Sequence, residues 1–174
     1  MVALSRLVFA LVLFLAGCGP TSSPSTAAPT NSPSDQETDS LQRESLLVRV
    51  DTGLSPFVQV GGEIILELDV TNVGPRDIQD LTIIVNDAYI AMMAVFETSP
   101  SAIRHNEQGG EYFTFGALAK GKTQRYVIRM SPKDPGTFIA DVDVAGWSPS
   151  NMVPLPQDGG GVAEFTYGTD VAQK

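Results

Sequence analysis

Apolar and polar residues alternate with a period of two along much of the chain after residue 45. The clearest case is the segment 63–72, in which Ile64, Leu66, Leu68 and Val70 occupy every second position between mostly polar residues. Successive side chains of a β-strand point to opposite faces, so one face of this segment is expected in a core and the other in water. The pattern therefore predicts a half-buried strand.

The same alternation, interrupted by turn residues, recurs along the rest of this region. The sequence Asn72-Val73-Gly74-Pro75 ends the strand at 63–72, because Gly accepts a positive φ, Pro donates no hydrogen bond and the Asn side chain can bond its own backbone. Leu118, in the tight connection 116–122, is expected to close one end of the core. Further strands are predicted at 46–50, 57–60, 78–86, 112–115, 124–130, 137–144 and 162–167.

Two segments do not follow the alternation. The segment 88–96 is continuously apolar and fits either a strand or one to two helical turns, and we expect a mostly extended connection. The segment 99–110 is polar and is predicted to be a loop. About seven short antiparallel strands without a long helical pattern predict an all-β fold. We expect a single immunoglobulin-like β-sandwich at 45–170 and a short C-terminal tail at 171–174.

The N-terminal region carries a different signal. An apolar segment at 7–15 follows Arg6 and is too short to span a bilayer, as expected of a secretory signal peptide. It leads into the sequence Leu15-Ala16-Gly17-Cys18, which resembles the lipobox of bacterial lipoprotein precursors. The resemblance implies that residues 1–17 are removed and that Cys18 becomes an N-terminus linked to diacylglycerol, on the extracytoplasmic side of a bacterial membrane. The alternative is an ordinary cleavage site, such as one at Ala16, with Cys18 incidental.

Residues 18–44 are dominated by Ser, Thr and Pro and show no apolar periodicity. Such a segment cannot bury enough apolar surface to fold, so it is predicted to be a disordered linker between the lipid and the sandwich. It is either a spacer that lets the domain reach through a wall or crowded surface, or a tether constrained only by length and solubility.

A second resemblance lies within the predicted sandwich. The sequences DVTNVGP at 69–75, FGALAKGK at 115–122 and PGTF at 135–138 occur in the order and spacing seen in CARDB-type bacterial immunoglobulin-like modules. The resemblance covers the region 58–146 and implies a module of cell-surface or adhesion-related proteins. Phe138 and Ala140 stand where immunoglobulin folds have a corner Tyr and a bridging Cys, so the sequence lacks that hydroxyl group and that disulfide.

The charge and the residue composition argue against several classes of partner and activity. The 174 residues carry a formal net charge of −9, and about −10 once Arg6 is removed, which argues against nucleic acid and anionic lipid head groups as partners. Cys18 is the only cysteine, and His105, in the predicted polar loop, is the only histidine. A nucleophile–base pair or a metal cage cannot be assembled from these residues. Neither catalysis nor a cofactor is therefore expected.

Two places remain as candidate contacts. Asp141 and Asp143 share the outward face of one predicted strand, and Glu164 is expected on a neighbouring strand, which would create an acidic patch. A plain solvated face is the more ordinary interpretation. Trp147 lies in a Pro-rich segment between the last two predicted strands, and it either contacts a ligand or partner or folds back over the end of the core.

Together these patterns predict a non-catalytic surface lipoprotein whose domain mediates protein–protein interaction, adhesion or envelope-complex assembly. Its expected partners are membrane lipid, through Cys18, and another envelope protein or a glycan. The alternative is an accessory module that binds a cell-surface glycan or a cation near Trp147 or the acidic patch.

Overall fold

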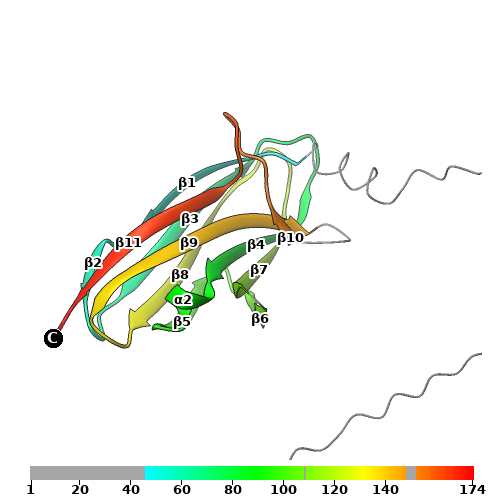
Figure 1. Cartoon of the computed structure of the whole chain (residues 1–174). Coiled ribbons are helices and arrows are strands. Elements are labelled where there is room, and N and C mark those ends of the chain that lie inside the picture. The colour runs from blue at the N-terminus through cyan, green and yellow to red at the C-terminus, as the bar shows by residue number, and fades with distance from the viewer. Residues whose placement is uncertain (1–45, 108, 148–151) are drawn as a thin grey trace, which may run out of the picture. The chain divides into compact units, whose positions relative to one another are not determined.

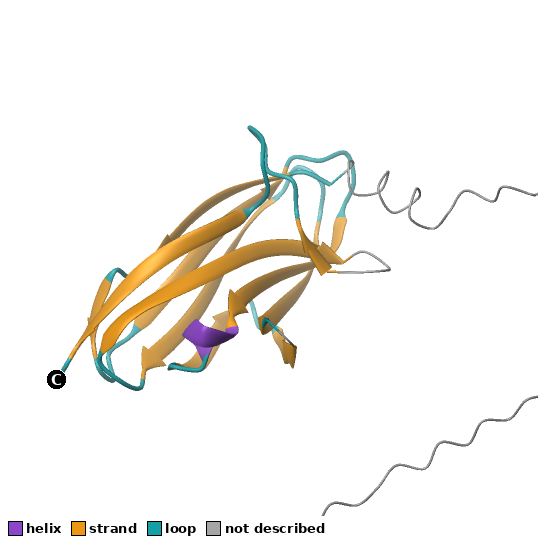
Figure 2. Ribbon diagram, in the orientation of Figure 1, coloured by secondary structure: helices purple, strands orange, loops and turns teal. Residues whose placement is uncertain are grey.

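The computed structural model describes residues 46–107, 109–147 and 152–174, which fold into two packed β-sheets (Figure 1). Strands make up most of this part of the chain, with one helical turn (Figure 2). The two-sheet arrangement confirms the predicted all-β sandwich. The expected signal peptide, the lipobox with Cys18 and the linker at 18–44 lie outside the described residues.

The smaller sheet has four strands and the larger has seven. The order in the smaller sheet is β1 (Val48–Leu54), β3 (Ile64–Asn72), β8 (Thr123–Pro132) and β5 (Met93–Ser99). The order in the larger sheet is β2 (Phe57–Gln59), β11 (Glu164–Ala172), β9 (Gly136–Trp147), β4 (Ile78–Asn86), β7 (Gly110–Leu118) and β6 (Ile103–Glu107), with β10 (Met152–Pro154) paired to the end of β9. β2 pairs with β11 in parallel, and the other pairings between these strands are antiparallel.

Seven of the described strands form an immunoglobulin frame. A constant-type immunoglobulin sandwich places its first, second, fifth and fourth strands in one sheet and its third, sixth and seventh in the other. Here β1, β3, β8 and β5 make up the first set, and β4, β9 and β11 make up the second. The hairpin β6–β7 is inserted between the fourth and fifth strands of this frame, and it widens the larger sheet beyond β4 (Figure 1).

The core lies between the sheets and is built from the positions that the alternation predicted. Ile64, Leu66, Leu68 and Val70 of β3 are fully buried, and Leu118 is buried at the end of β7 as expected. Burying an aliphatic or aromatic side chain contributes about 1.5–3 kcal/mol, so these positions dominate the stability of the sandwich. The larger sheet contributes the buried residues Leu81, Ile83, Val85, Phe113, Val142 and Val144.

A buried asparagine joins two loops at one end of the sandwich. Asn72, the last residue of β3, is fully buried. Its Nδ2 donates to the carbonyl oxygens of Arg76 at 2.8 Å and Leu118 at 3.0 Å, and its Oδ1 accepts from the Gly74 amide at 3.1 Å. Both amide hydrogens and the side-chain oxygen are therefore used, which links the β3–β4 turn to the end of β7.

Three local predictions differ from the structure. The segment 99–110, predicted as a loop, contains β6, which is largely exposed on both faces and so shows no apolar–polar alternation. The segment 88–96 combines both alternatives, because the helical turn α2 (Asp87–Ile90) is followed, after two turn residues, by β5. The last strand continues to Ala172 with Val171 buried, beyond the expected domain limit at 170.

Candidate binding face

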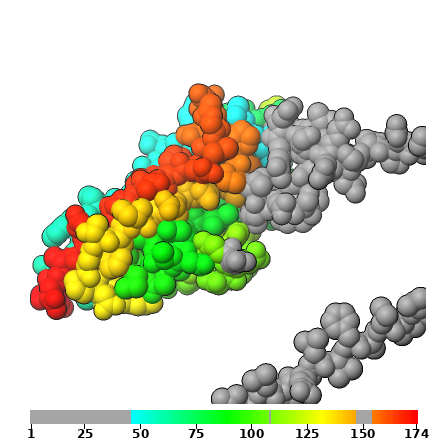
Figure 3. All heavy atoms as spheres, viewed as in Figure 1, coloured from blue at the N-terminus to red at the C-terminus, as the bar shows by residue number. Residues whose placement is uncertain are grey.

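The outer face of the seven-strand sheet brings together side chains from five strands. Strand register aligns one residue from each of β11, β9, β4, β7 and β6 in a row: Glu164, Asp143, Ile84, Tyr112 and His105. Adjacent strands lie about 4.8 Å apart, so the row extends about 19 Å across the sheet. Figure 3 shows β11 in red, β9 in yellow and β4 in green as one continuous surface.

Asp141 lies next to this row and is held by its neighbours. It is opposite Thr166 of β11, whose hydroxyl donates to Asp141 Oδ1 at 2.9 Å. The Asp141 amide donates to Asn86 Oδ1 of β4 at 3.1 Å. We call the surface formed by Asp141, Asp143, Glu164, Ile84 and Tyr112 the acidic face.

Asp143 is the central carboxylate of the acidic face and is half-buried. Burial raises the pKa of Asp143, and the negative charges of Glu164 and Asp141 raise it further. Like charges directly opposite each other on adjacent strands destabilise a sheet. The ionised Asp143 carboxylate therefore opposes folding instead of supporting it.

The inserted hairpin adds two aromatic rings to this side of the sheet. The rings of Tyr112 and His105 stack with their centroids 5.0 Å apart and their planes at 22°. Burial raises the pKa of Tyr112, and the charges of Glu107, Asp143 and Asp87 raise it further, so this ring lies in the negative field of the face. His105 lies on strand β6 and not in the loop that the sequence predicted.

The outer face of the four-strand sheet carries carboxylates that are paired with arginines. Arg129 Nη1 lies 2.6 Å from Glu63 Oε1, and its Nε lies 3.6 Å from Glu97 Oε2. Arg125 donates to both oxygens of Asp69, at 3.1 and 3.2 Å. The two outer faces therefore differ in how their carboxylates are paired. Here Glu63, Glu67, Asp69 and Glu97 each lie within 4.0 Å of an arginine, with Asp51 directly opposite Asp69, whereas the carboxylates of the acidic face lie beside one another.

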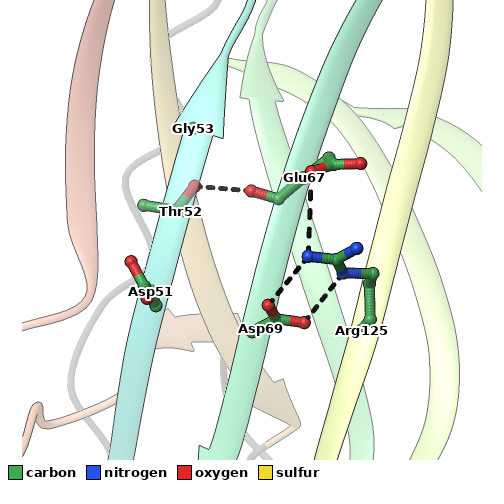
Figure 4. Close-up of a pocket in the computed structure, with 6 residues that line it drawn as sticks. All are labelled: Asp51, Thr52, Gly53, Glu67, Asp69 and Arg125. Atoms are coloured by element: carbon green, nitrogen blue, oxygen red, sulfur yellow. Dashed lines mark hydrogen bonds and ion pairs between the residues drawn. The ribbon is translucent and has the colours of Figure 1, made fainter.

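A shallow groove of about 250 Å³ lies on the outer face of the four-strand sheet, between β1, β3 and β8 (Figure 4). In Figure 4 the Arg125 guanidinium points toward Asp69 and Glu67, and the Thr52 hydroxyl donates to the Glu67 carbonyl at 2.9 Å. The hydrogen bond to Asp69, with the charges of Asp69 and Glu67, raises the pKa of Arg125. Because these side chains already satisfy one another, the groove is a weaker candidate site than the acidic face.

The structure brings together three of the residues that the sequence pointed to and leaves two aside. Asp141, Asp143 and Glu164 share one face, as alternation along their strands predicted. The backbone of Trp147 ends β9, where it pairs with Met152 of β10, but the Trp147 side chain lies outside the described part of the structure, as does Cys18. The predictions for these two side chains therefore stay predictions.

Sequence reasoning did not single out Ile84 and Tyr112. Each occupies an outward position in an alternating segment, and that is the one signal the sequence carries for them. Their place beside Asp143 depends on the pairing of β4 with both β9 and β7. The β4–β7 pairing involves the inserted hairpin, of which the sequence predicted only the strand at 112–115.

Within residues 46–107, 109–147 and 152–174, no three His, Cys, Asp or Glu side chains are grouped so as to hold a metal ion. In the same ranges, no helix has the length and apolar character needed to cross a membrane. The acidic face offers carboxylates, an aliphatic side chain and a phenol for contact with a partner.

The strand order defines the described domain as an immunoglobulin-like β-sandwich. Its sequence matches no known family and no curated protein. Among solved structures, it resembles the CARDB domain of the PF1109 protein from Pyrococcus furiosus, solved in complex with di-metal ions, with 14% identity over 74% of this chain and 90% of that one and a TM-score of 0.47. It also resembles a cohesin module from a Clostridium perfringens family 33 glycoside hydrolase, with 11% identity over 74% and 99% and a TM-score of 0.49. A third likeness is to PapD-like domain 7 of human CEP192, with 12% identity over 90% and 99% and a TM-score of 0.41.

Replacing Asp143 by Asn is expected to stabilise the protein at neutral pH. Because the folded-state pKa of Asp143 is raised, the folded protein binds this proton more tightly than the unfolded chain, and that stability is lost as pH rises through the folded pKa. Asp143→Asn removes the cost of the charge, with a gain below about 1 kcal/mol since the group is partly solvated. Urea denaturation at pH 7 and at about pH 3, below the ordinary aspartate pKa, measures the difference.

The gain from Asp143→Asn is expected at pH 7 and is expected to disappear at the lower pH. Asp134→Asn, in the exposed turn between β8 and β9, makes the same change in net charge and serves as the control. A lower stability of Asp143→Asn than of wild type at pH 7 would contradict the unfavourable environment assigned to this carboxylate.

Proposed function

We propose that the chain is a lipid-anchored surface protein of a bacterial envelope whose sandwich binds another envelope protein and catalyses no reaction. The observation that carries the proposal is the contrast between the two outer faces. Four carboxylates on the four-strand sheet lie within 4.0 Å of Arg125 or Arg129, whereas those of the acidic face lie beside one another. A surface whose charges are not balanced within the molecule is suited to complementary charges from another one.

The stability cost of Asp143 supports the same proposal. Residues selected for folding alone do not require a half-buried carboxylate opposite another carboxylate. Side chains that lower stability are commonly retained where a function needs them. Asp143 is therefore better explained by binding than by folding.

The N-terminal sequence supports the membrane part of the proposal. The lipobox resemblance at 15–18 assigns Cys18 as the anchor, and two or three acyl chains hold a protein stably on a bilayer. The linker would hold the domain off the membrane by roughly 25–30 Å if it behaves as a flexible chain.

Replacing Cys18 by Ala is expected to abolish lipidation and membrane retention. The full-length protein is produced in a bacterial host fed an alkyne analogue of palmitate, and the label and the membrane fraction are measured. Wild type is expected to be labelled and sedimented with membranes, and Cys18→Ala to be unlabelled and either unprocessed or released. Thr21→Ala, outside the lipobox, is the matched control and should behave as wild type. Retention of the processed Cys18→Ala variant in the membrane fraction at the wild-type level would refute the anchor.

A photo-crosslinking residue placed in the full-length protein tests the partner. Position 166, exposed beside Asp141, samples the acidic face, and position 123, exposed on β8, samples the opposite face. We expect reproducible capture of one envelope protein from position 166 and no such capture from position 123, as identified by mass spectrometry. If the proteins crosslinked from position 166 do not exceed the background seen from position 123, a protein partner on this face is refuted.

A further inference from the structure

The acidic face has a charge pattern of one sign. Strands β11, β9, β4 and β7 carry no Lys or Arg anywhere along their lengths. β6 carries Arg104, whose Nε donates to Glu111 Oε1 at 2.7 Å and whose guanidinium lies 5.5 Å from the centre of the buried Phe113 ring. Arg104 Nη1 also donates to the Val95 carbonyl of β5 in the other sheet. Arg104 therefore links the edges of the two sheets. Because its guanidinium is engaged there, it does not neutralise the carboxylates of the acidic face.

Apolar side chains are interleaved with the carboxylates on this face. Ile84 lies half-buried between Asp143 and Tyr112, and Ile139, two residues before Asp141 on β9, is 50% exposed. Ile139 is opposite Gly168 of β11, which has no side chain to cover it. A ligand that supplied charge alone would leave these apolar surfaces in water, and a purely apolar ligand would bury the carboxylates without partners.

The spacing of the face fits an extended polypeptide segment better than a single ion. The row from Glu164 to His105 extends about 19 Å, which is several times the reach of one coordinated cation. In the described ranges, no three acidic or histidine side chains converge on one point. A segment with both basic and apolar side chains can pair with the carboxylates and cover the isoleucines at the same time.

We propose that the acidic face binds a basic segment of a partner protein, whose Lys or Arg side chains pair with Asp141, Asp143 and Glu164 while its apolar side chains cover Ile84 and Ile139. This inference rests on the proposed function and specifies the chemistry of the partner. Pairing relieves the repulsion between Asp143 and Glu164, so part of the folding cost of this face is recovered on binding.

The test measures capture from position 166 in two variants with equal net charge. The first variant combines Asp141→Asn, Asp143→Asn and Glu164→Gln. The control variant removes the same number of carboxylates from the opposite face. We expect the acidic-face variant to lower the crosslink yield by about tenfold or more, because it removes three charge contacts.

The control combines Glu63→Gln, Glu67→Gln and Glu97→Gln on the four-strand sheet, and its yield should stay within about twofold of wild type since general attraction to a negative protein is unchanged. Thermal unfolding of both variants checks that each is folded. The crosslinked peptide is sequenced, and we expect it to carry a net positive charge.

An unchanged yield in the acidic-face variant would overturn the basic-segment proposal. An equal loss in the control variant, or a crosslinked segment without Lys or Arg, would do the same. Loss of wild-type capture on adding EDTA would also overturn it, because the contact would then run through a metal ion. In each of these cases a protein partner is still captured and the proposed function stands. Absence of any capture by wild type removes both proposals.

Discussion

Replacing Asn72 by Asp is expected to lower the free energy of unfolding by about 3–5 kcal/mol. The change is isosteric, but it exchanges the two N–H donors of Asn72 for an oxygen. The carbonyl oxygens of Arg76 and Leu118, now at 2.8 and 3.0 Å from Nδ2, would face that oxygen instead of a donor. Since Asn72 is fully buried, water cannot replace the lost bonds.

Urea denaturation at pH 7 measures this loss, and Asn106→Asp provides the matched control. Asn106 is exposed on the edge strand β6, opposite Glu111, so the same chemical change there should cost no more than about 1 kcal/mol. Part of the Asn72→Asp loss should be recovered at acidic pH, because a protonated carboxyl can donate one hydrogen bond. A loss at Asn72 no larger than that at Asn106 would mean that the two loops are not held by this side chain.

Replacing Phe113 by Ala is expected to cost about 3–5 kcal/mol, because it removes a fully buried ring and leaves a cavity in the core. Phe113 belongs to the inserted hairpin, which is not part of the seven-strand frame. A cost of this size would show that the hairpin is part of the same cooperative unit as the frame. Thermal or urea unfolding, followed by far-UV circular dichroism, provides the measurement.

The control for Phe113 is Phe96→Ala, which removes the same ring from a position that is 58% exposed on the edge strand β5. We expect a cost below about 1 kcal/mol there. If both variants lose little stability, the hairpin packs against the frame without contributing to its core, and Tyr112 would then lie on a separately mobile part of the acidic face.

The sequence alone is sufficient to predict the strands that have one face in the core and the other in solvent. β3 is the best example, because Ile64, Leu66, Leu68 and Val70 alternate without interruption and all are buried. The same rule placed Asp141 and Asp143 on one outward face. In both cases the prediction needed only the local geometry of a strand.

The remaining features depend on contacts between distant segments. The sequence predicts a loop where β6 lies, because an edge strand exposed on both faces has no alternation of apolar and polar residues. The stack of His105 on Tyr112 follows from the β6–β7 register, and the position of Ile84 beside Asp143 follows from the β4–β9 register. A single sequence does not specify which strands become neighbours, so the composition of the acidic face could be predicted only in part.

The two ends of the described domain lie at opposite ends of its strands, and this arrangement has a mechanical consequence. Leu47 is bonded to the turn after β3, whereas Ala172 pairs with Gln59 near the start of β3 (Figure 1). A tensile force between residues 46 and 174 therefore acts along the strands, sliding β1 against β3 and β11 against β2 and β9. Hydrogen bonds loaded in this direction share the load and must rupture together, so a pull between the two ends of the domain shears these strand pairs instead of separating them one bond at a time.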